Sequence, residues 1–275
     1  MTPVDEEDLT RKQRREKARE DRKAAEAAAA SDATRRKRIT QLAGVAVIVI
    51  VAIVVILVAS GGGSSKKAPP PPAKVNNLAK EIDQELAGIP QNGRTIGNPN
   101  APVTIQYFGD LQCPICGEFS KKSGALPKLI AGPVKEGKVK IEYLSLETAT
   151  REPEVFHTQQ KAAYAAGPQQ KAWHYIELFY NSQGQEDSGY VTEAFLQNLA
   201  QQIPGLDLPK WQAERGNAKY EAEIAADQQS ANNNGLTGTP AFLIGKTGGA
   251  LKKYEWSSLT DPKPFEEAIE QAAKS

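Results

Sequence analysis

An apolar run from Leu42 to Ala59 constrains this chain more than any other feature, because it contains no charged or strongly polar side chain. With the residues from Ile39 onward, a helix of this length can cross the ~30 Å hydrocarbon core of a bilayer. Four basic residues, 35–38, precede it. An excess of Arg and Lys marks the cytoplasmic flank of a membrane span, so everything after Ser60 is predicted to lie outside the cytoplasm. Residues 39–60 are therefore predicted to be a transmembrane signal anchor.

Two other interpretations of this segment are less favourable. A buried core helix is disfavoured because the run is apolar on all sides and has low-complexity flanks. A cleaved signal peptide would fit the small residues at 58–60, but the apolar run and the 38 residues before it are both too long for one. We therefore expect an uncleaved anchor in the cell membrane, crossing once, with a cytoplasmic N-terminus.

The anchor divides the rest of the chain into three predicted parts. Residues 1–38 form a charged cytoplasmic tail, residues 61–75 a linker of Gly, Ser and Pro, and residues 76–275 an extracytoplasmic domain. The domain is long enough to build its own core. The tail holds 12 of the 34 basic and 9 of the 33 acidic residues, so the remainder of the chain is slightly acidic. No strong positive field is left there for nucleic acid.

Hydrophobic periodicity predicts an α/β fold for the domain. A strand at 103–108, a helix at 117–130 and a strand at 138–146 form a strand–helix–strand unit, which implies parallel pairing. Within the helix, Pro127 is expected to limit or kink it. Further predicted helices are 78–86, 153–166, 169–181, 191–202, 209–231 and 264–274, and further strands are 241–244 and 251–256. The mostly helical stretch at about 150–231 is expected to be an insertion between strands.

Cys113 and Cys116 are the only cysteines, and they follow the first predicted strand. A thiol at a helix N-terminus faces unsatisfied N–H groups and the helix dipole, which favour the thiolate. A thiol one turn later can resolve a mixed disulfide by attacking the first. Pro114 suits the first turn of such a helix, and Ile115 completes the loop. We predict that Cys113 is the nucleophile and Cys116 the resolving thiol.

Two other uses of the cysteine pair fit less well. A zinc site would need two more ligands, and the only histidines, His157 and His174, are scattered in the chain and expected to be packing or surface residues. A purely structural disulfide across so short a loop would stabilise little. The predicted cofactor set is therefore the redox-active Cys113–Cys116 disulfide alone, with no metal and no organic cofactor.

The segments GNPNAPVTIQYFGDLQCPICGEFS at 97–120 and GLTGTPAFLIG at 235–245 resemble the DsbA-like thiol oxidoreductases of the thioredoxin superfamily, and in particular their membrane-anchored bacterial members. The resemblance covers roughly residues 95–275. It implies a thioredoxin-like fold with a helical insertion, preceded here by the single transmembrane helix. It also implies that Thr239 and Pro240 bind substrate, with a cis peptide bond between them. The main chain at Thr239 would then pair with an extended substrate segment beside Cys113.

Three features depart from that family. Ile115 stands where many members have a histidine, which leaves the redox potential open. Tyr107 stands six residues before Cys113, where the family often has a buried acid, so proton transfer at Cys116 would use water or another group. Asp110 is closer to the cysteines and suits a turn or cap role as well as a catalytic one. No dimerisation module is visible, so a monomer is expected.

The resemblance implies an enzyme that donates disulfides to folding secreted or envelope proteins by dithiol–disulfide exchange. It also implies re-oxidation by a membrane partner linked to quinones. A disulfide reductase or isomerase on the same fold remains an alternative, because the direction of electron flow depends on the reduction potential. A membrane-tethered binding or chaperone module is a second alternative, from a different class.

Overall fold

The computed structural model describes residues 73–274. The predicted cytoplasmic tail and anchor, and most of the predicted linker, lie outside the described residues. Within residues 73–274, no helix is both long enough and apolar enough to span a bilayer.

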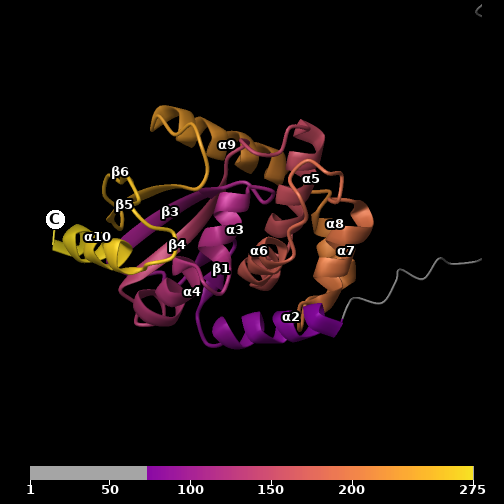
Figure 1. The fold of residues 1–275 in the computed structure, drawn as a ribbon, viewed down its shortest axis with the longest axis horizontal. Helices are drawn as coiled ribbons and strands as arrows, with labels where there is room; N and C mark the ends of the chain where they lie inside the picture. Colours follow the sequence, from indigo (N-terminus) through magenta and orange to yellow (C-terminus); the bar gives the residue numbers. More distant parts are fainter. Residues whose placement is uncertain (1–72, 275) are drawn as a thin grey trace, which may run out of the picture. The chain divides into compact units, whose positions relative to one another are not determined.

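A six-stranded mixed sheet organises the described residues (Figure 1). Its central strands run parallel, with Val103 opposite Val139 and Gly109 opposite Ser145. The remaining neighbours in the sheet pair antiparallel. In sheet order, the strands are β1 (Gln91–Asn92), β2 (Thr95–Ile96), β4 (Val139–Ser145), β3 (Val103–Gly109), β5 (Ala241–Lys246) and β6 (Lys252–Tyr254).

The two parallel strands share one burial pattern along their length. Each alternates buried and half-buried residues at first and ends in three fully buried ones. The three buried residues lie at the carboxyl end of each strand, which is therefore covered on both faces, as expected at the centre of an α/β sheet. The loops that carry the cysteines and Asp110 therefore leave the most buried edge of the sheet.

Helices cover the sheet and form the insertion between β4 and β5. The elements outside the insertion are α2 (Ala73–Glu85), α3 (Pro114–Ser120), α4 (Ala125–Leu129), the π-helical turn η2 (Ile130–Val134) and α10 (Lys263–Lys274). The insertion contains α5 (Pro153–Tyr164), the short 3₁₀ turn η3 (Gly167–Gln169), α6 (Ala172–Asn181), α7 (Glu193–Gln202), α8 (Leu208–Glu214) and α9 (Lys219–Asn233). In Figure 1, α6, α7 and α8 lie beyond α3, on the side away from β6 and α10.

The predicted helix 117–130 is wrong in its continuity. It is two helices, α3 and α4, separated at Lys121–Gly124, and Pro127 sits inside α4 and does not break it. The turn between them is very tight at Gly124, where an added Cβ would lie 2.0 Å from the carbonyl oxygen of Phe119. A proline in the first turn of a helix costs nothing, because the N–H that it lacks would have no partner there.

Two further elements differ from the prediction. The helix predicted at 209–231 is two, α8 and α9, because Arg215–Ala218 breaks the helical hydrogen bonding. The short hairpin of β1 and β2 was not predicted, since two-residue strands show no periodicity. It exists because β2 pairs with the edge of β4, opposite Ile141 and Glu142.

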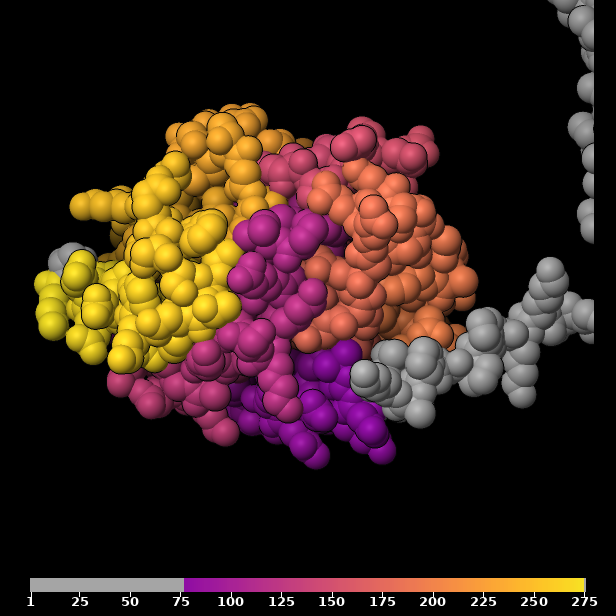
Figure 2. Space-filling view, in the orientation of Figure 1, coloured from indigo at the N-terminus to yellow at the C-terminus, as the bar shows by residue number. Residues whose placement is uncertain are grey.

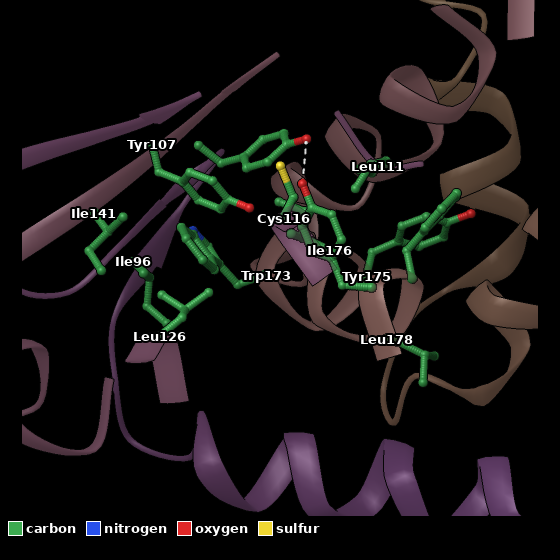
Figure 3. Packing of buried hydrophobic residues seen from close by; sticks show 14 of the residues in the cluster. Ile96, Tyr107, Leu111, Cys116, Leu126, Ile141, Trp173, Tyr175, Ile176 and Leu178 are labelled. Atoms are coloured by element: carbon green, nitrogen blue, oxygen red, sulfur yellow. Dashed lines mark hydrogen bonds between the residues drawn. The ribbon is translucent and has the colours of Figure 1, made fainter. Parts of the chain in front are cut away.

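One large cluster of buried side chains joins the sheet, α3, α10 and the insertion, and it includes both cysteines. Figure 3 shows the part of this cluster around Cys116. Tyr107 of β3 lies inside it, with ring centroids 5.2 Å from Phe119 and 5.3 Å from Phe242. Phe265 and Ile269 of α10 are buried in the same cluster. The predicted α/β architecture with a helical insertion is confirmed.

Candidate active site

Cys113 occupies the N-cap of α3, with Pro114 as the first helical residue. Its backbone is extended, at φ −65° and ψ 118°, so its sulfur turns back over the first turn and accepts the Cys116 N–H at 3.4 Å. Hydrogen bonding by the Cys116 side chain is the main cause that lowers the pKa of Cys113 from 9.0 to about 6. Contacts with Thr239 and with the Ile115 and Cys116 amides lower this pKa further, while burial opposes them.

Cys116 has the opposite environment. It is fully buried, and burial raises its pKa well above 9.0, with the hydrogen bond and charge of Cys113 adding to the effect. Near neutral pH the outer sulfur is therefore a thiolate and the inner one a thiol. No disulfide joins the two cysteines in this structure, so it shows the reduced form. This asymmetry is what the roles predicted for the two thiols require.

The Thr239–Pro240 peptide bond is cis and lies beside the cysteine loop, although it is more than 120 residues away in the sequence. Cys113 Sγ lies 3.4 Å from the Thr239 carbonyl oxygen and donates a hydrogen bond to it when protonated. The Thr239 hydroxyl pairs with that of Thr148, at 2.6 Å between oxygens. The structure thus brings Cys113, Cys116 and the Thr239–Pro240 segment into one site.

Two apolar side chains stand exposed at this site. Ile115 is 44% exposed and Trp256 is 39% exposed, and within residues 73–274 they are the exposed large hydrophobic side chains. Trp256 Nε1 donates to the Pro240 carbonyl oxygen at 3.1 Å, which places the indole next to the cis bond. Figure 2 shows the α3 segment at the surface, between the C-terminal segment and the insertion. No feature of the sequence marked Trp256 as part of a site.

Asp110 is 0% exposed and fastens the cysteine loop to the segment after β4. Its carboxylate accepts six hydrogen bonds within residues 73–274, a number that points to a structural role. The donors are the backbone N–H groups of Gln112, Thr148, Ala149 and Thr150, the Thr150 hydroxyl and the Gln159 amide. Of the two roles left open by the sequence, the turn role is the one these contacts support.

Gln183, which follows α6, holds the cysteine loop from the other side. Its Nε2 donates to the carbonyl oxygens of Leu111 at 2.8 Å and Cys113 at 3.0 Å. The contact depends on Gly117, since an added Cβ there would lie 2.1 Å from Gln183 Oε1. A glutamine in a polar loop of the insertion carries no sequence signal for this contact, and we did not predict it.

The two histidines make contacts elsewhere in the insertion. His174 is buried where α6 meets α2 and contacts Gln91, Lys171 and Asp83; burial lowers its pKa to about 4. His157 pairs with Glu221 on α9. No cluster of three His, Cys, Asp or Glu side chains that could hold a metal ion occurs among residues 73–274.

A family profile described as thioredoxin matches residues 90–269. The chain belongs to the thioredoxin family. It is also 22% identical, over 167 residues, to a probable disulfide bond formation protein D of Bacillus anthracis. The matched region covers 60% of this chain and 74% of that protein.

Two solved structures share the fold of this thioredoxin-family chain. BdbD from Bacillus subtilis, in its oxidised form, has a TM-score of 0.55 and 18% identity over 66% of this chain and 94% of its own. Alpha-DsbA1 of Wolbachia pipientis has a TM-score of 0.54 and 18% identity over 69% and 96%. The predicted thioredoxin-like fold with a helical insertion is confirmed, and so is the likeness to DsbA-like proteins. At the level of reaction class, the prediction of a thiol:disulfide oxidoreductase is confirmed.

The pKa of Cys113 predicts how pH changes the stability of this thioredoxin-family enzyme. Its folded value, about 6, lies below the ordinary 9.0, so the thiolate stabilises the reduced folded form. This contribution is complete above the ordinary value and is lost as pH falls through the folded value. Between pH values of about 6 and 9, we expect the free energy of unfolding of the reduced form, minus that of the oxidised form, to rise with pH. Urea unfolding of both forms over that range measures the difference, and a flat profile would contradict the assignment.

Proposed function

We propose that the chain donates a disulfide to secreted or envelope proteins by exchange at Cys113–Pro114–Ile115–Cys116. The observation that carries the proposal is the lowered pKa of Cys113. A stabilised thiolate favours the reduced form of the enzyme, and so makes its disulfide an oxidant. The similarity to a disulfide bond formation protein supports the same direction.

The exchange takes two displacements. A substrate thiolate attacks Cys113 Sγ of the enzyme disulfide; a bond forms between the substrate sulfur and Cys113, and Cys116 leaves as a thiolate. A second substrate thiolate then attacks the substrate sulfur of this mixed disulfide, and Cys113 leaves as a thiolate. The substrate loses two electrons and gains a disulfide, while the enzyme is left as a dithiol. A leaving thiol of low pKa speeds the second displacement.

The proposed substrate site lies along the Thr239–Pro240 segment. An extended, unfolded segment would pair with the main chain at Thr239 in the manner of strand addition, with its cysteine beside Cys113. The exposed side chains of Ile115 and Trp256 would contact apolar residues that such a segment exposes before it folds.

The proposed setting is the outer side of the cell membrane, with residues 39–60 as the anchor and the tail in the cytoplasm. Disulfides persist in that oxidising compartment. A chain with only two cysteines has no third thiol that could form a wrong disulfide there. We further propose that the enzyme acts as a monomer and that a quinone-linked membrane partner re-oxidises it.

The reduction potential of the full-length chain in detergent, measured against glutathione, tests the direction of exchange. We expect a value well above the approximately −270 mV of thioredoxin, because the Cys113 thiolate stabilises the reduced form. A potential at or below that of thioredoxin would make the oxidant role untenable and would favour the reductase or isomerase alternative.

A further inference from the structure

Tyr107 carries a buried hydroxyl that makes no hydrogen bond of normal length and angle in this structure. The residue is on β3 and is 0% exposed. Its ring is held on several sides: it stacks on Phe242 with planes 19° apart and meets the rings of Phe119 and Tyr143 edge-on. Packing of this kind fixes the direction of the hydroxyl, because the ring cannot turn away.

The hydroxyl of Tyr107 points toward the sulfur of Cys116 (Figure 3). The two groups are close enough to influence each other, since the charge of Cys116 raises the pKa of Tyr107. Burial raises that pKa most, well above 10.0, so the hydroxyl keeps its proton throughout the working pH range. Tyr107 can therefore act as a hydrogen-bond donor but not as a base.

Two other tyrosine hydroxyls lie nearby, and their protons have acceptors already. Tyr143 donates to the Gly109 carbonyl oxygen at 3.1 Å, and Tyr180 donates to the Asp110 carbonyl oxygen at 3.3 Å. A tyrosine has a single O–H to donate. Within this cluster of three, the proton of Tyr107 is the one that no backbone carbonyl receives.

A buried donor without an acceptor is costly, and native structures keep few of them. Such a cost is explained if the acceptor exists in another state of the reaction. Cys116 is that acceptor, because a thiolate accepts hydrogen bonds much more strongly than a thiol does. The sulfur becomes a thiolate when it leaves Cys113, and again when it attacks a mixed disulfide during re-oxidation.

We propose that Tyr107 donates a hydrogen bond to the Cys116 thiolate in both of these steps and so lowers the barrier to forming a buried sulfur anion. The inference rests on the proposed exchange at Cys113 and Cys116. Tyr107 keeps its own proton, and the proton that Cys116 finally binds comes from solvent. The phenol of Tyr107 thus acts as a polar group that stabilises the buried thiolate of the resolving cysteine.

Oxidation of the reduced full-length chain by glutathione disulfide takes two steps, so the reactions of Cys113 and Cys116 can be measured separately. In the first step the Cys113 thiolate attacks the disulfide, forms Cys113–S–S–glutathione and releases one glutathione thiolate. In the second, the Cys116 thiolate attacks Cys113 Sγ, closes the Cys113–Cys116 disulfide and releases the other glutathione. The first rate depends on the glutathione disulfide concentration and the second does not.

In Tyr107→Phe we expect the second step to slow roughly tenfold to a hundredfold, as for loss of a hydrogen bond to a charged group. Its pH profile should move to higher pH, because Cys116 becomes harder to ionise. The first step should stay within about twofold of the wild type. The other titratable side chains acting on Cys116 are Cys113, Tyr143 and Tyr180, and burial keeps both tyrosines protonated. Hydrogen bonds from the Asp110 backbone and from Thr239 also lower the pKa of Cys116, and both groups are unchanged in this variant.

Tyr175→Phe is the matched control. Tyr175 is also fully buried and donates to the Leu196 carbonyl oxygen at 3.0 Å, in the insertion. Both steps should keep their wild-type rates in this variant. If Tyr107→Phe leaves the second step unchanged, or if both variants slow it equally, the inference is overturned.

If Tyr107→Phe does not fold, a second variant that keeps the hydroxyl but changes its strength as a donor tests the same inference. Site-specific 3-fluorotyrosine at position 107 makes the hydroxyl a stronger donor at almost the same volume, and the second step should then become faster. An unchanged or slower second step would overturn the inference. Failure of the wild type to form the mixed disulfide at all would instead count against the proposed function.

Discussion

Cys113→Ser reduces disulfide transfer to the uncatalysed rate, a loss of roughly a thousandfold or more, as expected when a covalent nucleophile is removed. A serine hydroxyl is not ionised near neutral pH, whereas Cys113, with a pKa of about 6, is mostly thiolate. Refolding of a reduced, unfolded substrate protein with two cysteines, followed by the appearance of its disulfide, measures the effect. Retained turnover would rule out Cys113 as the nucleophile.

Cys116→Ser is the paired variant, because it keeps the nucleophile and removes the resolving thiol. It should accumulate mixed disulfides between Cys113 and substrate, visible on non-reducing gels. Binding of the same substrate to Cys113→Ser, measured separately, addresses the alternative of a binding or chaperone module. Full biological function in Cys113→Ser, with binding intact, would favour that alternative over an enzyme.

Asp110→Ala lowers the free energy of unfolding by roughly 3 to 5 kcal/mol, near the upper end for a single substitution. The reason is the set of six donors that converge on this carboxylate, four of them backbone N–H groups. Asp110→Asn should also be strongly destabilising, because its NH₂ group would face donors. Urea unfolding of the full chain measures both variants.

Asp207→Ala is the control for this prediction. The Asp207 carboxylate caps α8 by accepting the Lys210 N–H at 3.1 Å, the one backbone N–H that this carboxylate accepts within residues 73–274. Its loss should cost much less than the loss of Asp110, as for an exposed helix N-cap. Equal losses at positions 110 and 207 would show that the contacts of Asp110 are not coupled into one structural unit.

The strands and outer helices could be predicted because their signals are local. Alternating apolar residues mark β3 and β4, and the spacing of Phe265 and Ile269 marks the inner face of α10. The break between α8 and α9 does have a sequence signal, since Arg215–Ala218 contains Gly216–Asn217, a pair typical of turns, and the prediction of one helix overlooked it. The hairpin of β1 and β2 depends on pairing with β4 and has no periodicity of its own.

The same distinction explains the site. The cysteine pair could be predicted because its chemistry and spacing are contained in four residues, and the Thr239–Pro240 segment through the family resemblance. Gln183 and Trp256 could not, because each acts through a main-chain oxygen that only the folded chain brings near. The sequence marks Tyr107 only as a departure from the family, whereas the direction of its hydroxyl follows from the packing of its ring in the folded chain.

The cysteine loop is held at its main chain, by Asp110 on one side and Gln183 on the other, while the side chain of Ile115 projects into solvent. A substitution at position 115 therefore leaves the main-chain contacts that hold the loop in place. Selection, or a protein engineer, could exchange this residue to retune the oxidising strength by steps without repacking the core. A graded set of oxidants that differ at position 115 alone would be a practical product of this arrangement.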